Sequence, residues 1–264
     1  MSETDRGGDP IQIRLRGVRK SFGAHPVLRG VDLDIERGKI NIIIGGSGQG
    51  KSVLVKHMIG LIKPDAGQIL VDGEDIVPMG DFALNRVRRK MGMLFQYSAL
   101  FDSMTVEENV SLPLLEHRKD LGRGRIREIA AERLDVLGIQ RRDLAKYPAE
   151  ISGGMRKRVA LARAIVLEPE ILIYDEPTTG LDPIATQNVD EMIADAAQRL
   201  GVTSVVISHD MTSTFRIGHR VSMLYDGRIV AHGTPREILD TKHPVLRQFI
   251  ELSGVGIAPG GALP

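Results

Sequence analysis

The sequence predicts an α/β fold in which a parallel sheet lies between helices and an antiparallel β subdomain adjoins it. Three short, continuous apolar runs indicate buried parallel strands, at Ile40–Ile44, Ile171–Tyr174 and Val202–Ile207. Helical patterns lie between these runs, which is typical of βα-alternating folds. Near the start of the chain, residues 11–22 and 25–39 alternate apolar with polar side chains, as half-exposed antiparallel strands do.

The rest of the chain divides by composition. Glycine and proline punctuate helical stretches such as "RIREIAAERLDVLG", which indicates an α-helical subdomain at about 97–160, inserted into the α/β core. "VSMLYDGRIVAHG" predicts a hairpin that turns at Asp226-Gly227. We therefore expect a flexible N-terminus at 1–10, one domain at 11–251, and a Gly/Pro-rich C-terminal tail at 252–264.

Bulk composition excludes several classes of protein. With 264 residues, 42% of them hydrophobic, the chain can bury a full core. A net charge of +1 gives no global field that points to nucleic acid. The absence of cysteine excludes disulfides and thiolate metal sites. No apolar run approaches the length of a transmembrane helix, and the polar N-terminus lacks a secretory signal, which predicts a soluble intracellular protein.

A phosphate-binding loop follows the first buried strand. "INIIIGGSGQGKSVLVKHMIG" matches G-x-x-x-x-G-K-[ST] between a predicted strand and a predicted helix, the context that this motif needs. Its glycines let backbone N–H groups converge on phosphate oxygens, while Lys51 reaches the β and γ phosphates and Ser52 binds Mg²⁺. The alternative is a glycine-rich turn without function. The predicted nucleotide contacts are Gly45, Gly46, Ser47, Gly48, Gln49, Gly50, Lys51, Ser52 and Val53.

Two carboxylates follow the second buried strand in "ILIYDEPTTGLDP". Asp175 ends the strand, where a carboxylate is costly unless something pairs with it, and Mg²⁺ held by Ser52 would do so. Glu176 is then free to take a proton from water, as nucleotide hydrolysis requires. Alone, such a pair is often a plain strand end.

Polar residues also follow two other predicted strands. His209, in "VVISHD", is the candidate to contact the γ-phosphate or the attacking water, although a lone histidine is more often structural. Gln96, after the strand-like "KMGMLF", is a weaker candidate because a glutamine there is usually a surface group.

The stretch "ISGGMRKRVALARA" predicts a helix that is capped by Ser152 and begins with two glycines. Three cations, Arg156–Arg158, follow at once, although the positive end of the helix dipole disfavours them. One interpretation is a solvated basic face. The other is that this helix tip faces something strongly negative.

Taken together, these residues resemble those of ATP-binding-cassette (ABC) ATPases, over nearly the whole chain. The matching motifs come in the family's order: Phe22, GGSGQGKS, FQ, ISGGM, ILIYDE, TGLD and SHD. The resemblance implies a P-loop NTPase core with a RecA-like parallel sheet, and a head-to-tail homodimer with two ATP molecules at its interface. It implies catalytic roles for Lys51, Gln96, Glu176 and His209, Mg²⁺ ligation by Ser52, Gln96 and Asp175, and nucleotide contacts from Phe22, Ser152, Gly153, Gly154 and Asp182.

Within the family, the chain departs from the commonest pattern at Gly46, Val53 and Met155, and none of these departures removes a catalytic group. The longer motifs look like those of the ATPases of Mce-type lipid transporters, including the Mla type. That likeness implies phospholipid as cargo, a membrane permease, a periplasmic Mce-domain protein and a STAS-domain partner. It also implies a cytoplasmic location on the inner face of the inner membrane. No nucleic-acid partner is expected.

Other functions stay open on sequence grounds. An ATPase of the same fold could serve another importer, such as one for amino acids. A non-transport ATPase that acts on DNA or ribosomes is disfavoured, because the chain lacks long heptad runs, a second cassette and a strong basic patch. A non-catalytic nucleotide-binding module conflicts with the presence of both Glu176 and His209.

Overall fold

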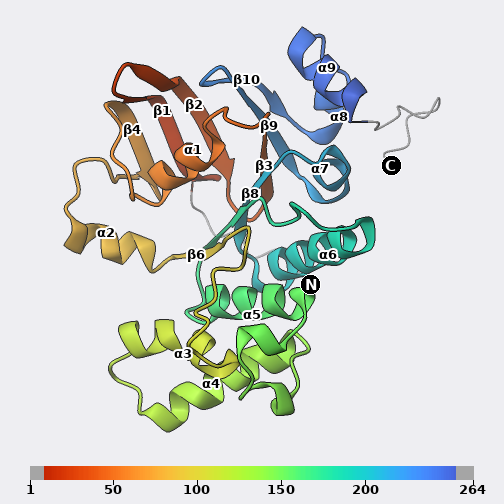
Figure 1. Cartoon of the computed structure of the whole chain (residues 1–264). Coiled ribbons are helices and arrows are strands. Elements are labelled where there is room, and N and C mark those ends of the chain that lie inside the picture. Colours follow the sequence, from red (N-terminus) through yellow and green to blue (C-terminus); the bar gives the residue numbers. More distant parts are fainter. Residues whose placement is uncertain (1–8, 254–264) are drawn as a thin grey trace, which may run out of the picture.

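The computed structural model describes residues 9–253 of the chain (Figure 1). The flexible N-terminus that the sequence predicts at 1–10 lies outside the described residues, except for Asp9 and Pro10. The predicted C-terminal tail lies outside them as well, apart from Leu252, which ends a helix, and Ser253.

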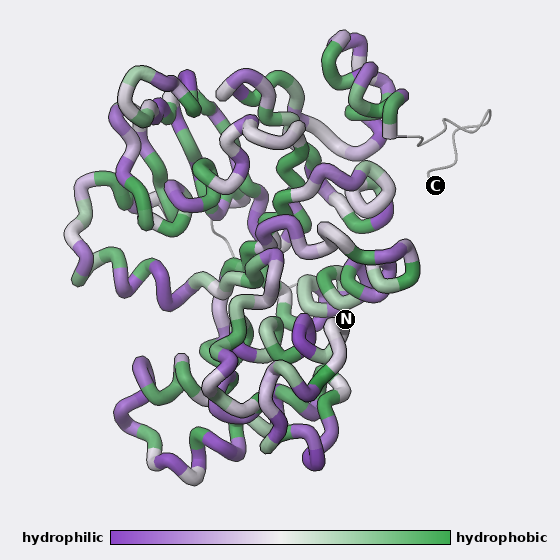
Figure 2. Tube along the Cα trace, viewed as in Figure 1, coloured by the Kyte–Doolittle hydropathy of each residue, from purple (hydrophilic) through white to green (hydrophobic). Residues whose placement is uncertain are grey.

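A four-stranded antiparallel sheet forms the N-terminal part of the fold. Its order is β2-β1-β4-β5, and its strands are β1 (Ile11–Phe22), β2 (His25–Glu36), β4 (Ala66–Val71) and β5 (Glu74–Asp75). The alternation predicted for the first two strands is confirmed, since apolar residues such as Ile13, Leu15 and Leu33 are buried. Hydrophobic and hydrophilic residues alternate along these strands in Figure 2.

A six-stranded sheet forms the centre of the molecule, in the order β10-β9-β3-β8-β7-β6. The five strands from β9 to β6 pair in parallel, and β10 pairs antiparallel with β9 to close the predicted hairpin. The strands are β3 (Ile40–Ile44), β6 (Met91–Leu94), β7 (Ile171–Asp175), β8 (Thr203–Ser208), β9 (Arg220–Tyr225) and β10 (Arg228–Gly233). The α/β prediction is confirmed, with β8 displaced by one residue because its pairing begins at Thr203.

Helices cover both faces of this sheet. Alternate residues of β3 serve different hydrophobic clusters, since Ile42 and Ile44 lie in one and Ile43 lies in the other. Two-sided burial of this kind accounts for the continuous apolar runs in the sequence. The helices outside the insertion are α1 (Lys51–Met58), α2 (Asp81–Arg88), α6 (Pro183–Leu200), α7 (Met211–Ile217), α8 (Pro235–Leu239) and α9 (Pro244–Leu252).

A helical insertion lies between β6 and β7 and occupies the lower part of Figure 1. It contains α3 (Val106–His117), α4 (Arg123–Val136), α5 (Gly153–Ile165) and two short 3₁₀ turns at 141–143 and 148–150. Helix α5 has two buried faces. Val159 and Ala162 pack in the insertion's own cluster, whereas Leu161 and Ile165 pack in the core.

Because of this double packing, α5 connects the insertion to the α/β core along its whole length. The domain limits at 97, 160 and 251 stay predictions; the limit near 160 falls inside this helix. Between residues 9 and 253, no helix combines the length and the apolar character needed to cross a membrane.

Candidate functional site

The glycine-rich loop is shaped by contacts that exclude a side chain. It joins the fully buried strand β3 to the start of α1. Gly50 adopts a left-handed conformation, with φ of 95°, and a Cβ there would lie 2.9 Å from the Val27 side chain. A Cβ on Gly45 would lie 2.4 Å from the carbonyl oxygen of Leu224. The loop therefore fits tightly against β2 and β9 through its glycines.

Lys51 is the buried cation of this loop. Its side chain is 5% exposed, and its ammonium donates to the carbonyl oxygens of Gly45 at 2.8 Å and Gly46 at 3.0 Å. The same Nζ lies 3.4 Å from Oε1 of Glu176. A positive charge is thus held at the centre of a glycine loop, as binding of a polyphosphate requires.

The remaining loop residues differ in their surroundings. Ser47 and Gly48 are exposed, and Gly46 is half-buried. Gln49 fixes the loop to the β9–β10 turn, because its Oε1 accepts from the backbone N–H of Asp226 at 2.7 Å. The Val53 side chain packs against the cluster that contains Ile43, so the departure from the family pattern at this position adds to the core.

Ser52 and Asp175 form an oxygen pair at the end of β7. The Ser52 hydroxyl donates to Oδ1 of Asp175 at 3.4 Å. Burial raises the pKa of Asp175, the hydrogen bond from Ser52 opposes this effect, and the charge of Glu176 adds to it. A hydroxyl and a buried carboxylate fit Mg²⁺, which takes one or two protein oxygens and completes its shell with phosphate oxygens and water. Across residues 9–253, no cluster of three or more His, Asp or Glu side chains suits a metal held by protein alone.

Glu176 lies at the centre of a group of polar side chains. Its backbone is left-handed, with φ of 48°, and its N–H donates to the carbonyl oxygen of Ile207 on β8. Oε2 accepts a hydrogen bond from Thr179 at 3.0 Å and lies 3.5 Å from Nδ1 of His209. Oε1 faces Lys51. The carboxylate is therefore fixed from three sides while its own side chain stays 23% exposed.

Thr179 is a site residue that sequence reasoning missed. The left-handed conformation of Glu176 starts a turn in which the N–H of Thr179 donates to the carbonyl oxygen of Glu176. This turn returns the Thr179 hydroxyl to the carboxylate. The signal in the sequence was a threonine three residues after the glutamate, in "DEPTTG".

Besides the Ser152–Gly154 segment, three other predicted site residues lie outside this group. Gln96 donates from Nε2 to the Tyr97 hydroxyl at 3.3 Å, and among the described residues its side chain forms no bond with Ser52 or Asp175. Phe22 is 48% exposed, with the Lys20 ammonium 5.7 Å from its ring centroid. Asp182 caps α6 by accepting from the N–H groups of Ile184 and Ala185.

The Ser152–Gly154 segment forms an exposed helix tip. Ser152 caps α5, because its hydroxyl accepts from the N–H of Met155 at 3.3 Å. Ser152, Gly153 and Gly154 are all exposed. Helices α1 and α5 lie well apart in Figure 1, so the structure does not bring this tip to the glycine-rich loop of its own chain.

The three cations after this tip have different environments. Arg156 donates to the carbonyl oxygens of Ile151 at 2.9 Å and Pro148 at 3.4 Å. Lys157 is 7% exposed, so the interpretation as a solvated basic face is wrong for this residue. Of the three cations, only Arg158 is exposed, so the interpretation as a solvated face fits this residue alone.

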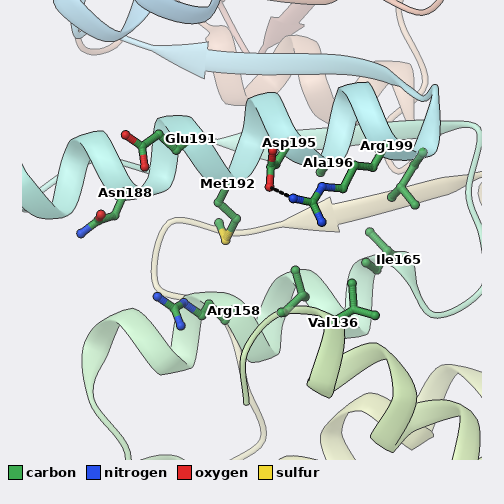
Figure 3. A pocket seen from close by; sticks show the side chains of 11 residues that line it. Val136, Arg158, Ile165, Asn188, Glu191, Met192, Asp195, Ala196 and Arg199 are labelled. Carbon is green, nitrogen blue, oxygen red and sulfur yellow. Dashed lines mark ion pairs between the residues drawn. The ribbon is translucent and has the colours of Figure 1, made fainter. Parts of the chain in front are cut away.

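Two pockets lie away from the Lys51–Glu176 group. The first, of about 600 Å³, lies beside β6 and is lined by residues that include Phe95, Ala99, Phe101, Pro113 and Arg163. Phe101 is exposed, whereas Leu100 is half-buried because it packs against both neighbouring clusters. The second, of about 520 Å³, lies between α6 and the helices α4 and α5, where Arg158, Met192 and an Asp195–Arg199 ion pair meet (Figure 3).

Comparison with known proteins places the chain among ABC transporter proteins. The model of the "ABC transporter" family matches residues 28–179. The chain is 41% identical to a probable ribonucleotide transport ATP-binding protein, mkl, of Mycobacterium leprae, over 95% of this chain and 71% of that protein. It is also 41% identical to MlaF, the intermembrane phospholipid transport system ATP-binding protein of Escherichia coli K12, over 94% of this chain and 90% of that protein.

A solved structure shows a similar fold. It is a dimeric ATP-binding cassette in a post-hydrolysis state, bound to ADP and phosphate. It has a TM-score of 0.76 and 31% sequence identity, and the match covers 85% of this chain and 99% of that one.

Proposed function

The chain belongs to the ABC transporter family and is an ATPase, and from this premise we propose that it powers the movement of phospholipid between bacterial membranes. The observation that carries the catalytic part is the group of Lys51, Glu176 and His209 around a glycine-rich loop. The assignment of phospholipid as cargo is supported by similarity to a phospholipid transport ATPase over 90% of that protein's length.

In the proposed reaction, Lys51 binds the β and γ phosphates. Its ammonium is held by two loop carbonyl oxygens and by Glu176, so the charge is already in place when a nucleotide enters. Contact with phosphate would weaken the ion pair between Lys51 and Glu176. Glu176 would then be freer to accept a proton.

Glu176 is the proposed general base. It would take a proton from the attacking water, while Thr179 fixes the orientation of its carboxylate. His209, next to Oε2 of Glu176 and half-exposed, would donate to the γ-phosphate or to that water. Ser52 and Asp175 would hold Mg²⁺, which neutralises charge that develops on the phosphates.

Two copies of the chain would form each complete site. The Ser152–Gly154 tip is exposed, offers free N–H groups of a helix start, and lies apart from its own chain's glycine-rich loop. A γ-phosphate that this tip binds would therefore belong to a second copy. ATPases of this family work as dimers with membrane permeases, and the similar cassette with ADP and phosphate is described as dimeric. ATP would close this dimer and hydrolysis would reopen it.

The groove beside β6 is the proposed contact with the permease. Its rim carries exposed aromatic side chains, with Phe95 at 41% and Phe101 at 49% exposed. The segment that carries them runs from the end of β6 through Gln96 into α3, so it joins the catalytic region to the insertion. A periplasmic Mce-domain protein and a STAS-domain protein are the further proposed partners, at the inner face of the inner membrane.

Identity alone does not separate the possible cargoes. The mkl protein, named for ribonucleotide transport, is as similar as MlaF. The greater coverage of MlaF's length favours lipid, and we place ribonucleotide or amino-acid import second.

The test is purification of the tagged full-length chain from detergent-solubilised membranes, followed by reconstitution of the complex. We expect an integral-membrane permease and an Mce-domain protein to copurify, and ATP to drive transfer of a fluorescent phospholipid between vesicles. A complex with Glu176→Gln is the control and should transfer none. Copurification of a solute-binding protein, with no lipid transfer, would contradict the lipid assignment but leave the ATPase intact.

A further inference from the structure

Lys157 joins two segments of the candidate site. It lies on α5 with its side chain 7% exposed, and its ammonium donates to the carbonyl oxygen of Gln96 at 3.2 Å and to that of Pro177. Gln96 follows β6, and Pro177 comes directly after Glu176. One side chain therefore holds the backbone of two loops that carry predicted catalytic groups, those of Gln96 and Glu176.

The charge of this side chain is met only by carbonyl dipoles. Among residues 9–253, Lys157 forms no ion pair with a carboxylate, and burial alone lowers its pKa. Burying a cation in this way is unfavourable unless its hydrogen bonds stabilise another part of the structure. A leucine or methionine would fill the same space without that cost. An apolar side chain could not form the two hydrogen bonds to these carbonyl oxygens, which require a donor.

The same helix holds the loop after Gln96 at a second point. Arg163, one and a half turns further on, donates to the carbonyl oxygens of Ser98 at 2.9 Å and Ala99 at 2.8 Å. Ser98 and Ala99 are both left-handed, with φ of 64° and 45°, which is unfavourable for residues with a Cβ. Contacts to α5 thus stabilise a strained loop conformation.

Lys157 also lies one turn from the exposed tip of α5. Hydrogen bonds inside that turn make the tip a rigid extension of the helix, since Ser152 caps it and Arg156 binds the carbonyl oxygen of Ile151. A displacement of the Gln96 and Pro177 carbonyl oxygens would therefore move the tip as well.

We propose that Lys157 is a positioning residue that couples the two ATP sites of the dimer. It connects the Gln96 and Glu176 loops, which belong to its own chain's site, to the Ser152 tip, which would serve the second copy's site. This inference rests on the two-site dimer of the proposed function. Hydrolysis at one site would shift the shared backbone and withdraw the tip from the other.

The experiment measures turnover of the full-length chain against ATP concentration, and separately the binding of a fluorescent ATP analogue. Lys157→Met keeps an unbranched side chain of nearly the same length and removes the donor group. Lys157→Gln keeps an amide donor, and Lys157→Arg keeps a cation with several donors. Arg158→Met is the matched control, because Arg158 is adjacent on the helix but points into the pocket between α5 and α6 (Figure 3).

We expect wild-type turnover to rise with a Hill coefficient clearly above one. Lys157→Met should lower maximal turnover at least tenfold and bring the Hill coefficient to one, with analogue affinity changed less than twofold, because Lys157 touches no residue of the phosphate loop. Lys157→Arg should restore both values, Lys157→Gln should restore them in part, and Arg158→Met should match the wild type. Thermal melting of each variant separates these effects from loss of fold. If Lys157→Met does not fold, the Gln and Arg variants show whether Lys157 couples the sites.

Three results would overturn the proposal, and each points to a different failure. If the wild type is cooperative and a folded Lys157→Met or Lys157→Gln variant is equally cooperative and active, Lys157 does not couple the sites. If the wild type itself turns over with a Hill coefficient of one, the two-site premise fails together with the coupling. Loss of activity in Lys157→Arg equal to that in Lys157→Met would also contradict it.

Discussion

At the scale of single residues, the surroundings of Glu176 determine what the site can do. Lys51, Thr179 and His209 approach its carboxylate from different elements, and its left-handed backbone sets the direction of the side chain. A non-glycine residue held at positive φ is a local cost that the surrounding structure must offset. Here the offset includes a β8 carbonyl oxygen and the Thr179 hydroxyl.

Replacement of Glu176 by Gln removes the proposed proton acceptor and keeps the shape of the side chain. We expect turnover to fall by about 100- to 10,000-fold, since this is the usual contribution of a general base. Binding of a fluorescent ATP analogue should persist, and Lys51→Ala is the comparison that should lose it. Turnover of Glu176→Gln near the wild-type rate would reject the role of base.

Replacement of Thr179 by Val deletes the hydroxyl that holds Oε2 of Glu176. A net loss of about 1 kcal/mol corresponds to about fivefold slower turnover. The measurement is steady-state ATP hydrolysis at saturating ATP. Thr179→Ser, which retains the hydroxyl, should stay within about twofold of the wild type. Equal loss in both variants would show that packing, rather than the hydrogen bond, matters at this position.

Sequence and structure agree best at the ends of parallel strands. The glycine-rich motif predicts Lys51 and Ser52, whereas Asp175, Glu176 and His209 are predicted from their places at the ends of buried strands. The carboxyl ends of parallel strands meet at one edge of a sheet. Thr179 and Lys157 were missed as site residues. Their contacts depend on a local turn and on packing across the fold, which leave no periodic signal in the sequence.

At the scale of elements, the turn between β4 and β5 joins the antiparallel sheet to the core. Asp72, in that turn, binds Arg37 at 2.8 Å and Lys90 at 2.6 Å. Arg37 follows β2 and Lys90 precedes β6, so one carboxylate connects three elements. Burial opposes ionisation of Asp72, yet the hydrogen bonds from Lys90 and Arg37 hold its pKa below the usual value.

Asp72→Asn tests this connection without backbone strain, because asparagine tolerates the left-handed conformation of Asp72. At pH 7 we expect a loss of about 1 kcal/mol in the free energy of unfolding, after allowance for screening of its partly exposed partners. The lowered pKa means that wild-type Asp72 stabilises the fold above its unfolded pKa and loses this effect as pH falls through the folded pKa. Denaturant titrations of the two proteins should therefore converge at strongly acidic pH. A constant difference down to that pH would contradict the ionic account.

Element boundaries show what local patterns leave out. The sequence predicts strands at 40–44 and 171–174, and these agree with β3 and β7 to within one residue. The third strand begins at Thr203 rather than Val202, because a register with Ile171 on the neighbouring strand decides where pairing starts. Asp182, predicted as a nucleotide contact from family likeness, caps α6 in this structure, and its contact with nucleotide stays a prediction.

At the scale of the whole molecule, helix α5 connects the α/β core to the helical insertion. It begins at the exposed Ser152 tip, packs on the α/β core and on the insertion, and holds the loop after β6. The α/β class was predictable from the continuous apolar runs and the helical patterns between them, and the helical insertion from the change in composition along the chain. The strand order β10-β9-β3-β8-β7-β6 was not predicted, because it depends on crossovers between distant segments.

The central claim is that two copies hold ATP between the glycine-rich loop of one and the Ser152 tip of the other. The chain contains no cysteine, so single cysteines can be introduced without background. Ser47→Cys and Ser152→Cys would be placed on separate chains in the Glu176→Gln background and joined with a short thiol-specific cross-linker. Ser103→Cys, exposed on the insertion side of the loop after β6, replaces Ser152→Cys as the control.

The most direct measurement is the yield of this cross-linked pair with and without Mg²⁺-ATP. We expect an ATP-dependent product between Ser47→Cys and Ser152→Cys, and none with Ser103→Cys. If nucleotide binds but the Ser47→Cys and Ser152→Cys chains remain unlinked, ATP is not held between the glycine-rich loop of one copy and the Ser152 tip of the other.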